Sequence, residues 1–263
     1  MTAPAALSPF AGRTTRLSVN LNKVALLRNT RNHGEPSVLE AAAIVLDAGA
    51  HGITVHPRPD QRHIRPADVR ELANGLRDMP DVELNVEGNP FPEFMQLVRA
   101  TVPDQCTLVP DSPDARTSDH GWNLKEHAGR LEPIIAELRA LGVRVSLFMD
   151  ADSREWRVAR ALGADRVELY TESFAVAHAA GRGESVLAFY GVAAHRAQAA
   201  GLGVNAGHDL SLRNVGDFCT SPGSREVSIG HALVADALRM GLGAAVRAYL
   251  DVLSAGSFAS AGA

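Results

Sequence analysis

The chain has 263 residues, of which 46% are hydrophobic and 21% charged, and its formal net charge is -4. This length suits one large α/β domain, and the composition is that of a globular protein rather than a disordered or fibrous one. The negative balance argues against nucleic acid as a partner, although it permits a local pocket for anions. Since the sequence has neither a signal-peptide pattern nor an apolar run of about 18 residues, we expect a cytoplasmic protein with no membrane partner.

Short apolar runs rich in β-branched residues recur along the chain, and a helix-like segment follows each one. Several of these segments begin at Pro, Ser or Asn and end at Gly, as helices commonly do. The alternation indicates βα units around a parallel sheet whose strands are buried on both faces. We predict strands at 17–22, 52–57, 82–88, 105–110, 143–150, 165–171, 202–207 and 226–231.

Eight such units favour a single-domain TIM (β/α)8 barrel with extra short helices over residues 17–254. The alternative is a doubly wound open sheet, which normally has fewer strands and a glycine-rich phosphate loop after the first. No GxGxxG or GxxxxGK[ST] motif is present. We expect residues 1–16 and 255–263 to be a flexible extension and a flexible tail.

Polar side chains cluster where the predicted strands end, which is where barrel enzymes place their active sites. The first strand is followed by a lysine, in a chain whose only lysines are Lys23 and Lys125. The candidates in chain order are Asn20, Asn22, Lys23, His56, Arg58, His63, Asn85, Glu87, Glu168, Asn205, His208 and His231.

Two of these residues have the chemistry of proton transfer. His56 ends the second strand, beside Arg58, Arg62 and His63, so it suits a general acid or base next to guanidinium groups that grip a phosphate. Glu87 ends an apolar strand, where a buried carboxyl needs either a cation or a raised pKa. The alternatives are a loop histidine that caps a carbonyl and a structural ion pair.

His208 and His231 each follow a glycine, and His231 opens a predicted helix. A helix N-terminus presents N–H groups and a positive dipole end to an anion, although a plain helix cap is the alternative. We expect loop or surface positions for the other histidines: His33, His51, His120, His127, His178 and His195.

Neither metal nor disulfide is expected. The two cysteines, Cys106 and Cys219, lie far apart and in no CxxC pattern, and no HxxxH or HxH spacing occurs.

In chain order, the motifs VNLNKVALLRNTR, GITVHPRPDQRHIR, NVEGNP, LVPD, VSLFMDAD, VELYT, VNAGHDL and SIGHAL resemble those of the pyridoxine 5'-phosphate synthase family. The resemblance covers residues 17 to about 253. It implies a cofactor-free barrel, assembled as a homo-octamer (a tetramer of dimers), that condenses 3-amino-2-oxopropyl phosphate with 1-deoxy-D-xylulose 5-phosphate. The implied products are pyridoxine 5'-phosphate, phosphate and water.

The resemblance also implies a role for individual residues. His56 and Glu87 are the expected proton acceptors, and His208 is the expected proton donor. The aminoketone phosphate is expected at Asn20, Arg31, Gly230 and His231, and the ketose phosphate at Arg58, His63 and Thr117. Asn22, Lys23, Glu168 and Asp209 complete the expected substrate-binding set.

Two departures from the family pattern define a variant subclass. Many members have Asp-His where this chain has Asn22 and Lys23, and many have His-Gly where it has His208 and Asp209. A less favoured hypothesis is that Lys23 forms a transient Schiff base with the ketose.

Residues 111–123, rich in turn formers, are expected to form a lid that excludes water. Two other functions stay open: another phosphosugar aldolase or isomerase on the same barrel, and a non-catalytic sensor of phosphorylated metabolites.

Overall fold

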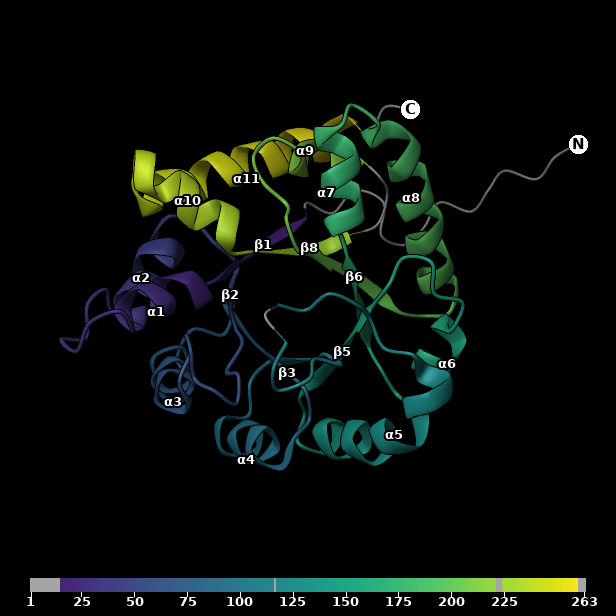
Figure 1. Ribbon diagram of the computed structural model, residues 1–263, viewed down its shortest axis with the longest axis horizontal. Coiled ribbons are helices and arrows are strands. Elements are labelled where there is room, and N and C mark those ends of the chain that lie inside the picture. The colour runs from purple at the N-terminus through teal and green to yellow at the C-terminus, as the bar shows by residue number, and fades with distance from the viewer. Residues whose placement is uncertain (1–14, 116, 221–223, 260–263) are drawn as a thin grey trace, which may run out of the picture.

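The computed structural model describes residues 15–115, 117–220 and 224–259, with side chains as far as residue 255. Eight parallel strands pair in chain order and β8 closes onto β1, which confirms the TIM barrel (Figure 1). The strands are β1 (Arg16–Asn20), β2 (Gly52–Val55), β3 (Glu83–Gly88), β4 (Gln105–Leu108), β5 (Arg144–Met149), β6 (Arg166–Tyr170), β7 (Gly203–Gly207) and β8 (Ser224–Ile229). Each of them overlaps a predicted strand.

Helices surround the barrel on its outer face (Figure 1). They are α1 (Asn22–Arg28), α2 (Val38–Asp47), α3 (Pro66–Gly75), α4 (Pro92–Thr101), α5 (Leu124–Ala140), α6 (Trp156–Ala161), α7 (Glu172–Ala179), α8 (Gly183–Ala199), α9 (Val215–Thr220), α10 (His231–Met240) and α11 (Leu242–Ala259). Within the described ranges, no helix has the length and apolar character needed to cross a membrane.

Two short helices, α1 and α7, are among the extra short helices expected for the barrel, although the sequence does not predict their positions. Asn22 was predicted to end the first strand, but it is the first residue of α1. The Leu21 N–H donates to the carbonyl of Thr54, and the Asn22 N–H donates to the side-chain oxygen of Asn20 at 3.0 Å. Because of this local turn, α1 begins at Asn22, and only Leu21 separates it from the end of β1.

The two faces of the strands differ in polarity. Outward-facing side chains such as Leu17, Val19 and Ile53 pack under the helices in the main hydrophobic core. The inward face is polar, because Ser18 and Thr54 share a hydrogen bond at 2.7 Å and Thr107 donates to Asn85 at 3.0 Å. The prediction that the strands are buried on both faces is therefore confirmed. The barrel interior, however, contains polar side chains, whereas the interior of most such barrels is filled by branched apolar ones.

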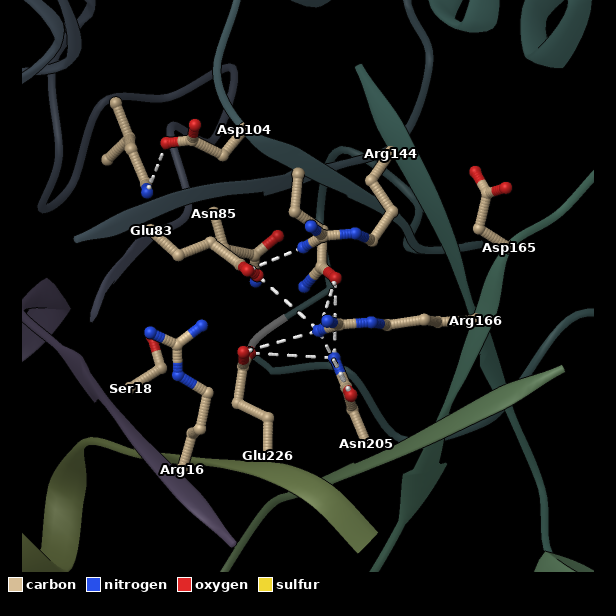
Figure 2. Close-up of polar contacts among 12 residues, drawn as sticks. Arg16, Ser18, Glu83, Asn85, Asp104, Arg144, Asp165, Arg166, Asn205 and Glu226 are labelled. Atoms are coloured by element: carbon tan, nitrogen blue, oxygen red, sulfur yellow. Dashed lines mark hydrogen bonds and ion pairs between the residues drawn. The ribbon is translucent and has the colours of Figure 1, made fainter. Parts of the chain in front are cut away.

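A cluster of charges fills the amino-terminal end of the barrel. Arg166 extends from β6 between Glu83 and Glu226, with N–O distances of 3.5 and 3.3 Å (Figure 2). Burial alone would raise the pKa of Glu83, but Arg166 and Arg144 together lower it. Burial and the neighbouring Glu83 raise the pKa of Glu226 to about 8. At neutral pH one carboxylate and one protonated carboxyl therefore share the Arg166 guanidinium.

Replacing this cation tests how much the buried cluster contributes to stability. Arg166→Leu leaves Glu83 with Arg144 alone and should lower the free energy of unfolding by about 3–5 kcal/mol near pH 8. Because the pKa of Glu83 is lowered in the native protein, its contribution is present above pH 4.5 and fades as pH falls. The loss should therefore shrink towards pH 4. Denaturant unfolding measures it, and Arg99→Leu, at the exposed pair with Glu137, is the matched control. Equal effects for the two variants would contradict this account.

Candidate active site

A cavity of about 350 Å³ opens at the carboxyl ends of the strands. It has the size of a small-molecule site. The expected site residues that line it are Asn20, Asn22, Lys23, His56, Arg58, His63, Glu87, Thr117, Glu168, His208, Asp209, Gly230 and His231. Three expected residues are not part of the cavity lining: Arg31, Asn85 and Asn205. Arg31 is exposed on the turn after α1. Asn85 and Asn205 are buried in the barrel interior, where Asn85 accepts from Thr107 and Asn205 accepts from Arg166.

His56 and Glu87 face each other from neighbouring strands, β2 and β3. The Nδ1 atom of His56 lies 3.9 Å from a carboxyl oxygen of Glu87, and both side chains are buried. Burial, with the charge of Arg58 next in importance, holds the pKa of His56 well below its ordinary value. His56 is thus a neutral imidazole at physiological pH and has a nitrogen available to accept a proton.

Two buried carboxyls of the cavity, Glu87 and Glu168, hold their protons. Burial and the nearby Asp111 raise the pKa of Glu87 to about 8, against a smaller opposing effect of Arg58. Burial and Glu87 also raise the pKa of Glu168 well above its ordinary range. A carboxyl that titrates near neutral pH can both give and take a proton at little cost, which suits Glu87 to acid–base catalysis.

His208 occupies a constrained turn at the end of β7. It has a φ of 88° and the following Asp209 a φ of 56°, both in the left-handed region. The Thr171 hydroxyl donates to the carbonyl of His208, and the Tyr170 ring packs edge-on against the imidazole at 5.0 Å. Burial lowers the pKa of His208, while the carboxylate of Asp209 acts in the opposite direction.

Cationic and neutral donors gather in the loop after β2. Arg58 is buried, pairs with Asp111 and donates to the carbonyl of Ala115 at 2.8 Å. The pKa of His63 is lowered to about 4, by burial and then by Arg58, so its ring is neutral. Its Nδ1 atom accepts from the N–H of Ile64 at 2.9 Å, which leaves the proton on Nε2. His63 is therefore a neutral donor at this end of the cavity.

A second group of donors lies across β1, where α10 begins. Gly230 precedes the helix and His231 is its first residue, so unpaired N–H groups of the first turn border the cavity. A Cβ atom at position 230 would lie 3.0 Å from the Asn20 side chain, which leaves little room for a larger residue. The cavity thus has donors suited to an anion on each side of β1.

Sequence reasoning missed some of the residues that shape this site. Asp111 pairs with Arg58 and accepts from the Ser118 hydroxyl at 2.8 Å. Its sequence signals are its place directly after a strand and at the end of the LVPD motif, and neither assigns it a role. Val109 and Phe148 line the cavity but are apolar residues at strand ends, which carry no signal of function. Both belong to a small apolar cluster with Tyr170.

The histidines without an expected role lie outside the cavity lining. Three of them have polar partners: His51 accepts from the N–H of Leu17, His120 contacts Asp119 and His178 contacts Asp217. Across the described residues, no group of three or more His, Cys, Asp or Glu side chains is arranged to hold a metal ion.

The raised pKa of Glu87 predicts a pH-dependent stability. The folded carboxyl keeps its proton to about pH 8 and the unfolded one loses it near pH 4.5, so raising the pH between these values destabilises the native state. Glu87→Gln removes this penalty, and the stability of the variant relative to the parent should increase from pH 5 to pH 9. Unfolding in urea across this range measures the difference, with the exposed Glu126→Gln as control. A difference independent of pH would show that Glu87 ionises normally.

Comparison with known proteins identifies the family of this chain. Residues 17–255 match the family model described as pyridoxal phosphate biosynthesis protein PdxJ. The chain is 54% identical to the pyridoxine 5'-phosphate synthase of Xanthomonas axonopodis pv. citri, over 92% of this chain and 98% of that protein. It is 55% identical to the protein of the same name from Albidiferax ferrireducens, over 92% and 99% of the two chains.

Two solved structures align with this chain at much lower sequence identity. The Amycolatopsis orientalis BexX/CysO complex aligns with a TM-score of 0.62 at 17% identity, over 97% of this chain and 94% of that one. A 4-hydroxy-2-oxoglutarate aldolase/2-deydro-3-deoxyphosphogluconate aldolase aligns with a TM-score of 0.59 at 15% identity, over 90% and 93%. These likenesses support the barrel fold alone, whereas the sequence matches establish that the chain belongs to the PdxJ family of pyridoxal phosphate biosynthesis proteins.

Proposed function

We propose that this chain is a pyridoxine 5'-phosphate synthase. It would condense 3-amino-2-oxopropyl phosphate with 1-deoxy-D-xylulose 5-phosphate and release phosphate and water, without a cofactor. The observation that carries the proposal is a buried acid–base centre, Glu87 with His56, between two groups of anion donors in one cavity. Membership of the PdxJ family and the names of its close relatives support the choice of substrates.

The reaction needs proton transfers at several carbon and oxygen atoms in one enclosed space. Schiff-base formation, loss of water and phosphate, and ring closure each remove or supply a proton. In the proposed roles, the neutral His56 accepts a proton first, because its lowered pKa keeps a lone pair available. Glu87, with a pKa of about 8, exchanges protons with intermediates, and the protonated Glu168 donates a hydrogen bond to them.

His208 is the proposed proton donor. Its pKa is lowered in the free protein, so the imidazole must gain affinity for a proton when substrate binds. Two phosphate groups bring negative charge into a buried cavity, and such charge raises the pKa of nearby imidazoles. Asp209, which replaces the glycine common in the family, already acts in the same direction on His208.

The two substrates are proposed to bind at opposite sides of β1. Gly230, His231 and Asn20 would hold the aminoketone phosphate, and Arg58, His63 and Thr117 the ketose phosphate. Because Arg31 lies outside the cavity, its proposed contact requires the exposed turn after α1 to move.

Asn22 and Lys23 stand where many family members have Asp-His, and Asn22 makes a contact that an aspartate could also make. The Asn22 carboxamide oxygen accepts from the N–H of His56 at 2.9 Å, a bond that a carboxylate would accept equally well. Lys23 lines the cavity and can supply a cationic donor where other members have histidine. We therefore propose that the variant pair serves the same reaction.

The segment 111–123 is proposed to act as the lid. Its Ala115 carbonyl accepts from Arg58 and from Arg62, at 2.8 and 3.1 Å, so the segment rests on the side chains that would hold a phosphate. A cytoplasmic location and a homo-octamer, built as a tetramer of dimers, are further parts of the proposal, and light scattering of the purified protein tests the assembly.

Product formation is the direct test of the reaction. The protein incubated with both substrates should form pyridoxine 5'-phosphate, and Glu87→Gln should lower kcat by about 10²–10⁴-fold, as loss of a general acid–base does. Glu126→Gln, on the exposed face of α5, is the control. Binding of both phosphates without product would contradict the synthase and favour a sensor. Cleavage or isomerisation of the ketose phosphate alone would favour an aldolase or isomerase.

The role of Lys23 has its own test. As a hydrogen-bond donor to bound anions, Lys23 should tolerate histidine: Asn22→Asp with Lys23→His should keep kcat/KM within about threefold, whereas Lys23→Met should lower it about tenfold or more. Borohydride reduction in the presence of each substrate, followed by mass mapping, should find no adduct at Lys23. An adduct there, together with an inactive histidine variant, would instead establish a covalent role.

A further inference from the structure

The residues at the end of α1 hold the β2–α3 loop in place from outside the cavity. The loop, residues 57–65, carries Arg58 and His63. Asn22, at the start of α1, accepts from the N–H of His56 at 2.9 Å. Asn29, the C-cap of the same helix, donates to the carbonyls of Arg62 and His63 at 3.0 and 2.8 Å.

A buried ion pair fixes Asn29 in turn. Arg28 pairs with both carboxylate oxygens of Asp68, and its Nε and Nη2 atoms donate to the Asn29 side-chain oxygen at 3.1 and 3.0 Å. The Nη2 atom of Arg28 also donates to the carbonyl of His63 at 3.3 Å. With its oxygen occupied by Arg28, the Asn29 amide must present its NH₂ group to the loop. Both ionic side chains are under 10% exposed.

The same carboxylate anchors the far end of the loop. Asp68, in the first turn of α3, accepts from the N–H of Arg65 at 2.7 Å. The backbone between residues 62 and 65 is therefore held from α1 and from α3 together. This stretch contains the Ile64 N–H, which donates to Nδ1 of His63 and so sets the tautomer and direction of the imidazole.

We propose that Arg28, Asn29 and Asp68 are positioning residues for the ketose-phosphate site. They touch no substrate in this account, which rests on the proposed function for the identity of the ligand, and they act through the His63 backbone. Their effect is to present the Nε2–H of His63 in one fixed arrangement, so that binding does not have to order this part of the loop.

The isosteric substitution Asn29→Asp tests this inference, because it replaces the NH₂ donor by an oxygen that faces two carbonyls. Calorimetric binding of 1-deoxy-D-xylulose 5-phosphate should weaken about tenfold, and binding of 3-amino-2-oxopropyl phosphate should stay within about twofold. Deuterium exchange of the 57–65 amides should rise. Arg28→Lys, which keeps the charge and loses the forked geometry, should show the same selective effect at smaller size.

Two controls separate positioning from a general loss of stability. Asn74→Asp changes an exposed asparagine of α3 that accepts from Arg77, and it should leave both affinities unchanged. Arg144→Lys weakens a partly buried ion pair at the opposite end of the barrel, and should lower the thermal midpoint without a selective change in affinity. If Asn29→Asp and Arg28→Lys leave both affinities unchanged, or weaken both equally as the thermal midpoint falls, the inference is overturned.

Failure of the proposed function would look different. A parent protein that binds the ketose phosphate but makes no product would contradict the synthase, while the affinities of Asn29→Asp would still decide the role of the loop. A parent protein that binds no ketose phosphate would overturn both.

Discussion

The burial of charge inside the barrel is the constraint on which the rest of the structure depends. At the amino-terminal end, Glu83 has Arg166 and Arg144 as partners, so it is ionised and holds the strands together. At the carboxyl end, burial without an equal share of cations leaves Glu87 and Glu168 protonated. The same residue type thus gives a structural ion pair at one end and a proton-transfer group at the other, and the difference is the number of guanidinium groups within reach.

The two ends of the barrel therefore differ in how they accommodate buried carboxyls: cations keep Glu83 ionised, whereas burial keeps Glu87 and Glu168 protonated. At the amino-terminal end the ionised Glu83 has two cationic partners and Glu226 keeps its proton. The cavity end instead holds buried polar groups whose desolvation is not fully offset without a ligand. Phosphorylated substrates would relieve part of this cost, since anions satisfy the free donors at Arg58 and at the start of α10. The short helix α1 joins the two sides, because its first residues line the cavity and its last residues fix the loop that carries His63.

Much of this arrangement could be predicted from the sequence, for physical reasons. A strand buried under helices must be apolar on its outer face, so the sequence predicts all eight strands. Most of the polar residues at the strand ends meet in the cavity, whereas Asn85 and Asn205 belong to the barrel interior. The helix α1 was not predicted, because Asn22 and Lys23 look like the end of a strand until the turn at Asn20 is known. The protonation of Glu87 was expected only as one of two possibilities, since the choice depends on Asp111 and Arg58, which lie elsewhere in the chain. The side chains of Val109 and Phe148 carry no chemistry that distinguishes a cavity wall from a core.

The central claim is that one cavity places an acid–base centre between two anion sites. A crystal structure of the protein with inorganic phosphate tests this most directly. The account predicts two bound phosphates, one at Arg58 and His63 and the other at Gly230 and His231, with His56 and Glu87 between them. Phosphate at only one of these positions, or only outside the cavity, would contradict it.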